Sequence, residues 1–269
     1  MRFFVVAVSL FASAIVGCAA PRAGISPSRL AEETSLGVPS EGQASQHDAV
    51  VRVYTGHGTC SGVLVSRSVV LTARHCVVET LPGGEMTAVT KVPGVFHVEL
   101  GGDYLPWGRV AVTAVFPCDP HADGERDIAA LVLERKVPSD VPTASIASPH
   151  ERGTYVLQGF GSAVWPKTTA GGLVLEAKRR TTRGGDVATL SDDTVTVKGP
   201  SKPGDSGGAI LDARTRELVA IVSRGDYAHH FNGVAYGDVT IGARVDRCSV
   251  ALDRALARAG EVSSSVSTR

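Results

Sequence analysis

The chain has 269 residues, of which 43% are hydrophobic and 20% are charged, and Lys plus Arg balance Asp plus Glu at 27 each. A chain of this length can bury a sizeable core, and an all-β chain of this size can form one unit or two packed barrels. The net charge near zero, without a basic cluster, excludes the electrostatic pattern of proteins that bind nucleic acid or an anionic membrane surface directly.

The first 18 residues have the pattern of a targeting segment that is removed. Arg2 supplies a positive start, and residues 3–16 form an apolar run that is too short for a membrane-spanning helix. The run ends in Ile-Val-Gly-Cys, with Cys18 last, which resembles the lipobox of bacterial lipoproteins, where the cysteine becomes the lipidated first residue of the mature chain. An ordinary signal peptide cleaved near residue 19 or 20 is the alternative. We therefore expect an exported protein that a lipid anchor holds at the cell envelope, on the outer membrane or facing the periplasm, or that is otherwise secreted.

Both flanks of the remaining chain predict disorder. Residues 19–47 are rich in Ser, Pro, Gly, Ala and Glu and have no sustained periodicity, which is typical of a tether. The Ser-rich residues 261–269 form a tail. The folded domain is expected to span residues 48–260.

Short apolar runs rich in Val alternate with Gly, Pro and Asp from residue 49 onward. Closely spaced strands of this kind, with no long helical period among them, favour an all-β sandwich or barrel, and the pattern does not decide between the two. The connection between the two halves is expected at residues 138–150, which are rich in Pro and Ser. The expected strands are 49–54, 62–65, 69–72, 96–100, 109–115 and 128–133 in the first half, and 153–161, 171–183, 194–198 and 218–223 in the second.

The C-terminal segment has a helical period. Apolar residues recur there at steps of three and four, at Val245, Cys248, Leu252, Leu256 and Ala259. This spacing predicts an amphipathic helix over residues 246–259, which Gly260 ends.

Three polar residues stand where they could perform nucleophilic catalysis. His75 comes three residues after the apolar strand 69–72, Asp127 directly precedes the run 128–133, and Ser206 lies among glycines. A serine hydroxyl is a poor nucleophile unless a base takes its proton and donors await the oxyanion, so all the parts must be present. Taken singly, His75 could be a core residue, Asp127 a turn residue and the Gly-rich segment a flexible loop.

Four stretches in one order closely resemble the trypsin/chymotrypsin-like serine endopeptidases, over about residues 48–260: Cys60-Ser61-Gly62, Thr72-Ala73-Arg74-His75-Cys76, Asp127-Ile128-Ala129 and Gly204-Asp205-Ser206-Gly207-Gly208. The resemblance implies an all-β fold of two packed six-stranded antiparallel barrels, about residues 48–140 and 150–245. Their catalytic residues would lie in the cleft between the barrels. It also implies polypeptide substrates and no cofactor or metal, and we expect a monomer.

The resemblance implies a role for each site residue. His75 would be the general base, Asp127 would orient it, and Ser206 would attack, while the backbone N–H groups of Gly204 and Ser206 would form the oxyanion hole. The substrate-binding residues implied are Pro200 and Ser201 at the pocket floor, and Ser223, Arg224, Gly225 and residues 240–242 at its walls. Because no acid falls at the floor in the simplest alignment, we expect a preference for uncharged residues before the cut. A shifted alignment that places Asp226 or Asp238 there would predict Lys or Arg instead.

The cysteines follow the same resemblance in part. In the family, the pair that matches Cys60 and Cys76 forms a disulfide that braces the loop of the catalytic histidine. With Cys18 assigned to lipid, Cys118 and Cys248 remain and are expected to pair, which would tie the last helix to the first barrel. Two separate buried thiols are the alternative.

The N-terminal segment leaves the activation of such a protease open, and two functions other than proteolysis are alternatives. Residues 33–38 occupy the place of the family's mature N-terminus without its Ile-Val-Gly-Gly or a preceding basic residue, whereas Asp205, which would receive the new amine, is present. A protease that needs trimming or a partner to order its site is one interpretation. A non-catalytic binding module with the protease fold is another, which the complete set of His75, Asp127 and Ser206 disfavours. A lipid-anchored structural protein of the envelope is a third, which the intact oxyanion loop disfavours.

Overall fold

The computed structural model describes residues 49–56, 58–81, 86–100, 108–119, 126–161, 167–169, 172–174, 180–199, 201–225, 229–231, 234–236 and 239–261. The expected targeting segment with Cys18, the tether and residues 262–269 of the tail lie outside this part of the chain. Within these ranges, no helix is both long and apolar enough to cross a membrane.

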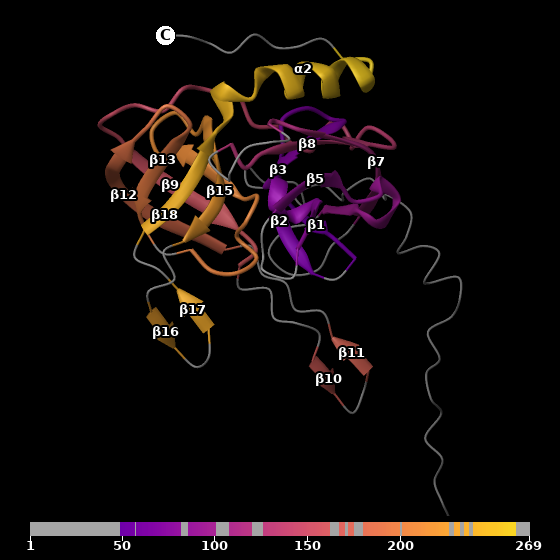
Figure 1. The fold of residues 1–269 in the computed structure, drawn as a ribbon, viewed down its shortest axis with the longest axis horizontal. Coiled ribbons are helices and arrows are strands. Elements are labelled where there is room, and N and C mark those ends of the chain that lie inside the picture. Colours follow the sequence, from indigo (N-terminus) through magenta and orange to yellow (C-terminus); the bar gives the residue numbers. More distant parts are fainter. Residues whose placement is uncertain are drawn as a thin grey trace, which may run out of the picture.

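The fold consists of two closed antiparallel barrels that lie side by side (Figure 1), as expected from the sequence. In order around the first barrel, the strands are β1 (Val50–Tyr54), β2 (Thr59–Leu64), β3 (Val69–Thr72), β8 (Ala129–Leu133), β7 (Gly108–Pro117) and β6 (His97–Leu100). In order around the second barrel, they are β12 (Arg180–Leu190), β13 (Thr194–Lys198), β18 (Val239–Arg244), β15 (Leu218–Gly225), β14 (Ala209–Asp212) and β9 (Thr154–Gly159).

Shorter elements complete the described chain. Three hairpins lie outside the barrels: β4 (Val78–Thr80) with β5 (Met86–Thr90), β10 (Lys167–Thr169) with β11 (Gly172–Val174), and β16 (His229–Phe231) with β17 (Val234–Tyr236). The 3-10 turns are η1 (Arg74–Cys76), η2 (Pro93–Val95) and η3 (Val245–Arg247). The expected strand over residues 171–183 is instead divided between β11 and the start of β12.

The burial of each strand reflects its place in the two barrels. β7 alternates between buried residues such as Val110 and Val112 and exposed ones such as Arg109, because one of its faces meets solvent. β8 is buried on both faces. Ala129, Leu131 and Leu133 face the core of the first barrel, whereas Ala130 and Val132 pack in a second core shared with residues of the other barrel and the C-terminal helix. The continuous apolar run in the sequence therefore marks a strand at the contact between the barrels.

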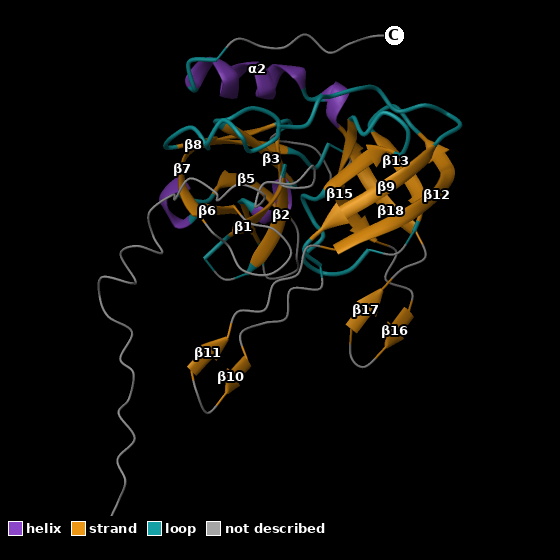
Figure 2. Ribbon diagram, turned by 180° about the vertical axis from the view of Figure 1, so that it is seen from behind, coloured by secondary structure: helices purple, strands orange, loops and turns teal. Residues whose placement is uncertain are grey.

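The C-terminal helix α2 (Ser249–Arg258) packs on β7 and β8 of the first barrel, and Figure 2 shows it lying along one end of that barrel. Its regular turns begin at Ser249 rather than Asp246, because Cys248 has φ −112° and ψ 23° and the preceding residues form the 3-10 turn η3. The helix ends before Gly260, whose φ of +70° suits a glycine after a helix C-terminus. The expected disulfide Cys118–Cys248 is present and joins the start of α2 to the end of β7.

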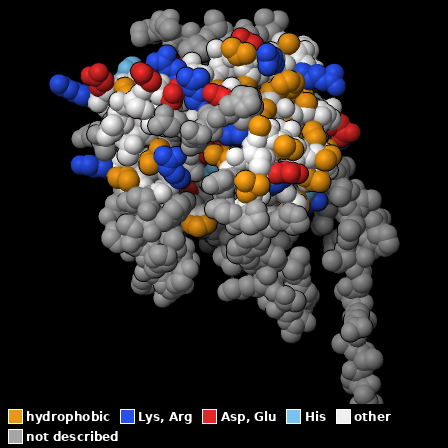
Figure 3. Space-filling model, viewed as in Figure 1, with side chains coloured by type: hydrophobic (Ala, Val, Ile, Leu, Met, Phe, Trp, Pro, Cys, Tyr) orange, Lys and Arg blue, Asp and Glu red, His pale blue; other side chains and the backbone are white. Residues whose placement is uncertain are grey.

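The surface differs between the two barrels. Figure 3 shows more hydrophobic surface on the side of the first barrel than on the described part of the second, where charged side chains are frequent. Exposed large hydrophobic residues of the described first barrel and its loops are Tyr54, Leu81, Val89, Val92 and Val95. Single exposed residues of this kind are normal on a protein surface, so we attach no function to them.

Candidate active site

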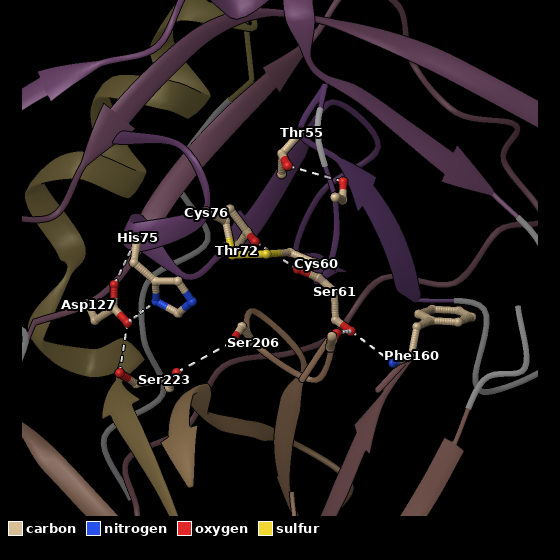
Figure 4. Close-up of a disulfide and its surroundings, with 12 residues drawn as sticks. Thr55, Cys60, Ser61, Thr72, His75, Cys76, Asp127, Phe160, Ser206 and Ser223 are labelled. Atoms are coloured by element: carbon tan, nitrogen blue, oxygen red, sulfur yellow. Dashed lines mark hydrogen bonds and ion pairs between the residues drawn. A yellow bond between two sulfur atoms is a disulfide. The ribbon is translucent and has the colours of Figure 1, made fainter. Parts of the chain in front are cut away.

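His75 and Asp127 meet because of the antiparallel register of β3 and β8. Thr72 at the end of β3 pairs with Ala129 at the start of β8, so the residues just beyond these two ends are neighbours although 52 positions separate them. Asp127 Oδ2 lies 2.7 Å from His75 Nδ1, and Asp127 Oδ1 accepts the His75 backbone N–H at 2.9 Å. The carboxylate thus fixes both the ring and the backbone of η1 (Figure 4).

Asp127 is almost fully buried, and its side chain is satisfied by donors from both barrels. Ser223, on β15 of the second barrel, donates its hydroxyl to Asp127 Oδ2 at 2.7 Å. An ionised carboxylate can only accept, so the proton on the His75 ring belongs on Nδ1 when the two groups bond. That tautomer leaves Nε2 of His75 unprotonated and able to act as a base.

Ser206 lies beside the His75 ring, on the side away from Asp127 (Figure 4). In the structure its hydroxyl contacts the carbonyl oxygen of Ser223 at 3.5 Å, and no hydrogen bond joins it to His75. Long or absent contacts between nucleophile and base are common in ligand-free sites and tighten when substrate binds.

The loop that carries Ser206 needs its glycines. Gly204 and Gly207 have φ of +97° and +85°, a region that favours glycine. A Cβ on Gly207 would overlap the Ser61 carbonyl oxygen and the Thr72 hydroxyl. Within the described residues, the backbone N–H groups of Gly204 and Ser206 donate to no backbone acceptor. These are the two donors that the resemblance assigns to an oxyanion hole.

The Asp205 carboxylate stabilises the loop that carries Ser206. Its Oδ1 accepts the Gly161 N–H at 2.7 Å, and its Oδ2 accepts the Lys202 N–H at 2.9 Å. Gly161 leaves room for the carboxylate, which a Cβ there would overlap. Two backbone donors therefore fix Asp205 in the described chain, and the expected N-terminal amine partner lies outside it.

Ser61 is a site residue to which sequence reasoning gives no role. Its N–H donates to the Ser206 carbonyl at 2.7 Å, and its hydroxyl donates to the Gly204 carbonyl at 2.7 Å. The only signal is its place in the stretch Cys60-Ser61-Gly62, for which the resemblance assigns no function to the serine.

The expected substrate-binding residues differ in how far they are exposed to solvent. Ser223 and Gly225 are buried on β15, and Arg224 between them is exposed. Ser201 is only 1% exposed, and its hydroxyl has no hydrogen-bond partner among the described residues. Pro200 lies outside the described residues.

The disulfide Cys60–Cys76 is present and joins β2 to η1, which carries His75. Cys60, His75 and Cys76 lie close enough together to resemble a metal-binding group. The two sulfurs are bonded to each other, however, and thiolates are the form of cysteine that binds metals. The cluster therefore braces the base and does not offer a metal site.

Comparisons with known proteins bear on the family and the fold. The family model described as Trypsin matches residues 37–240. A solved structure titled as a Glu endopeptidase in complex with MPD has a TM-score of 0.55 and 16% sequence identity, covering 83% of this chain and 95% of its own. Neuropsin, a serine protease expressed in the limbic system of mouse brain, has a TM-score of 0.54 and 16% identity, covering 80% of this chain and 99% of its own. No curated protein matches the chain by sequence.

Proposed function

Because the chain belongs to the trypsin family, we propose that it is a serine endopeptidase that hydrolyses peptide bonds with Ser206, His75 and Asp127. The observation that carries the proposal is the buried Asp127 carboxylate, which accepts from the backbone N–H of His75 and lies against Nδ1 of its ring. A buried carboxylate is costly unless it is fully hydrogen-bonded, and here its bonds leave His75 Nε2 as a base facing the nucleophile.

The reaction would proceed through an acyl-enzyme. Ser206 Oγ forms a bond to the substrate carbonyl carbon while its proton passes to His75 Nε2, and the carbonyl oxygen takes up the negative charge. The imidazolium is stabilised by Asp127. When the tetrahedral intermediate collapses, the proton moves from Nε2 to the leaving amine nitrogen as the C–N bond breaks. Water then attacks the ester carbon while His75 accepts its proton. His75 returns that proton to Ser206 Oγ as the ester C–O bond breaks and the acid product leaves.

The backbone N–H groups of Gly204 and Ser206 would bind the oxyanion. Loss of one such donor costs on the order of 100-fold or more in rate, so the loop geometry matters as much as the nucleophile. The left-handed φ of Gly204, and two N–H groups that donate to no backbone acceptor of the described chain, support this assignment.

For specificity, we propose uncharged residues before the scissile bond. The described part of the expected pocket supplies the buried hydroxyl of Ser201 and no carboxylate, so it offers no partner for a substrate Lys or Arg. A library profile dominated by Lys or Arg would contradict this.

For location, we propose an exported protein with Cys18 as its lipid-bearing residue, acting as a monomer at the cell envelope. The two disulfides support an oxidising compartment. Cys18→Ser should release the protein from the membrane fraction, whereas unchanged partitioning of this variant would contradict a lipid anchor at Cys18.

The test of activity is labelling of the folded protein with a fluorophosphonate, which reacts with an activated serine. Wild type should be labelled, and Ser206→Ala and His75→Ala should not. If folded wild type is not labelled but becomes so after N-terminal trimming, the protein is a zymogen. If it is never labelled, the non-catalytic binding module is the better explanation.

A further inference from the structure

Ser61 makes four hydrogen bonds at the contact between the two barrels, and it is fully buried. Its N–H donates to the Ser206 carbonyl at 2.7 Å, and its carbonyl accepts the Thr72 hydroxyl at 2.7 Å. Its hydroxyl donates to the Gly204 carbonyl at 2.7 Å and accepts the Phe160 N–H at 2.9 Å. Ser61 therefore touches the nucleophile loop twice, on either side of Asp205.

The direction of the hydroxyl is determined by its partners. The backbone N–H of Phe160 can only donate, and the carbonyl of Gly204 can only accept. The single proton of the Ser61 hydroxyl must then point at Gly204. A buried hydroxyl that donates one bond and accepts another in this way has one low-energy orientation, so it holds its partners in fixed positions.

These contacts fix two peptide planes next to the proposed oxyanion donors. The Gly204 carbonyl belongs to the peptide that joins Gly204 to Asp205, and the Ser206 carbonyl belongs to the peptide that follows Ser206. The Ser206 N–H belongs to the peptide between these two planes, so holding both restricts its direction, and holding the first restricts the chain directly after the Gly204 N–H. We propose that Ser61 is a positioning residue that sets the oxyanion hole, an inference that rests on the proposed function.

The same residue connects the two halves of the site. Ser61 follows Cys60, which is bonded to Cys76, and Cys76 follows His75 in η1. His75 and the oxyanion loop belong to different barrels, yet both are attached to the neighbouring residues Cys60 and Ser61 of β2. A shift of β2 would displace both together and keep their mutual geometry.

The test is Ser61→Ala, with Thr72→Val as the matched control. Thr72 is equally buried and also gives a hydroxyl bond next to Ser61, but that bond ends on Ser61 rather than on Gly204. Loss of an oxyanion donor outright costs on the order of 100-fold, so a loosened hole in Ser61→Ala should lower kcat about tenfold and leave KM within about twofold. Affinity for a peptide aldehyde, which places an oxyanion in the hole, should fall by the same factor.

Thr72→Val should melt at a lower temperature than wild type because it loses a buried hydrogen bond, and it should keep its kcat because that bond does not reach Gly204. The control therefore separates a loss of stability from a loss of orientation in the oxyanion hole. A Ser61→Ala protein that keeps wild-type kcat and aldehyde affinity would overturn the inference. So would a loss of kcat of equal size in both variants. Absence of hydrolysis in wild type would instead contradict the proposed function.

Amide hydrogen exchange tests whether Ser61 holds the nucleophile loop, and it does not depend on an activity measurement. The amides of Asp205, Gly207 and Gly208 are hydrogen-bonded within or to this loop, and they should exchange at least about tenfold faster in Ser61→Ala than in Thr72→Val. If Ser61→Ala does not fold, exchange in the wild-type protein tests the inference instead. The amides of Asp205, Gly207 and Gly208 should then be protected to the same degree as those of Ser61 and Phe160. Much faster exchange of the loop amides would show that Ser61 does not hold it.

Discussion

Ser223 and Asp127 belong to different barrels, yet the Ser223 hydroxyl donates to Asp127 Oδ2 at 2.7 Å, the same oxygen that His75 Nδ1 faces at 2.7 Å. Two donors, one from each barrel, thus converge on one carboxylate oxygen. The position of Asp127, and through it that of His75, depends on how the two barrels pack.

Removal of the Ser223 hydroxyl should slow catalysis without removing the base. Ser223→Ala takes away one hydrogen bond to a buried carboxylate, a bond to a charged group that contributes about 1.5–3 kcal/mol. We expect kcat/KM for a peptide substrate to fall about tenfold while fluorophosphonate labelling persists at a lower rate. Wild-type kcat/KM in this variant would show that Asp127 is held sufficiently by His75.

The Cys60–Cys76 disulfide should affect both stability and activity. The chain-entropy model assigns about 3 kcal/mol to a loop of roughly this size, whose ends are 16 residues apart in sequence. Cys60→Ala with Cys76→Ala should lower the free energy of unfolding by about that amount, measured by urea titration, and should lower kcat because η1 carries His75. The control is Cys118→Ala with Cys248→Ala, which should lower stability and leave kcat unchanged; the opposite pattern would contradict the brace.

Gly207 should tolerate no side chain. Its φ of +85° disfavours other residues, and a Cβ would overlap Ser61 and Thr72. Gly207→Ala should lower the free energy of unfolding by about 3 kcal/mol or abolish folding. Gly94, in η2, has open space within 4 Å of the point where a Cβ would stand, so Gly94→Ala should unfold at nearly the wild-type urea concentration. Similar midpoints for both variants would refute the steric argument.

Glu99 should make stability depend on pH in the acid range. Burial alone would raise the pKa of Glu99, but His97, whose Nε2 lies 3.5 Å from Oε1, and the charged groups of Arg52 and Arg109 outweigh it and hold that pKa at about 2, below the ordinary 4.5. A carboxyl whose folded pKa is lowered stabilises the fold above its unfolded pKa and loses that contribution as pH falls toward the folded pKa. About 3 kcal/mol should therefore disappear between about pH 4.5 and pH 2.

Glu99→Gln tests this directly. The variant should be less stable than wild type at neutral pH, since Arg52 loses its anionic partner, and its free energy of unfolding should vary less between about pH 5 and about pH 2.5. Equal acid dependence in the two proteins, measured by urea titration at each pH, would assign the effect to other carboxyls.

Most strands and the family could be predicted because each leaves a local mark in the sequence. The two barrels and the Cys60–Cys76 disulfide follow from the family, and the Cys118–Cys248 disulfide follows from the cysteines that remain. Apolar runs mark the strands, and short motifs with cysteines mark the family. β14 and β18 were not anticipated as strands. β14 has only four residues directly after the nucleophile loop, and β18 contains Gly242, which weakens a strand pattern but fits here since a Cβ would overlap Ile210.

The contacts of Ser61 could not be predicted from the sequence. Its hydroxyl partners, Gly204 and Phe160, are 143 and 99 residues away, and only the packing of one barrel on the other brings them together. Propensity and periodicity describe neighbours along the chain, so a residue whose role lies in long-range bonds looks like any other serine of a strand.

The Cys118–Cys248 bond has a consequence for how the molecule would survive a cut. The chain between these cysteines includes the whole second barrel and the connection from β8 to β9, while one cysteine lies on each side of that connection. A nick anywhere between β8 and β9 would therefore yield two polypeptides that remain one covalent particle, each contributing a barrel and each carrying part of the site. On a denaturing gel the fragments would separate only after reduction, so a nicked sample would be mistaken for intact protein unless reductant were added.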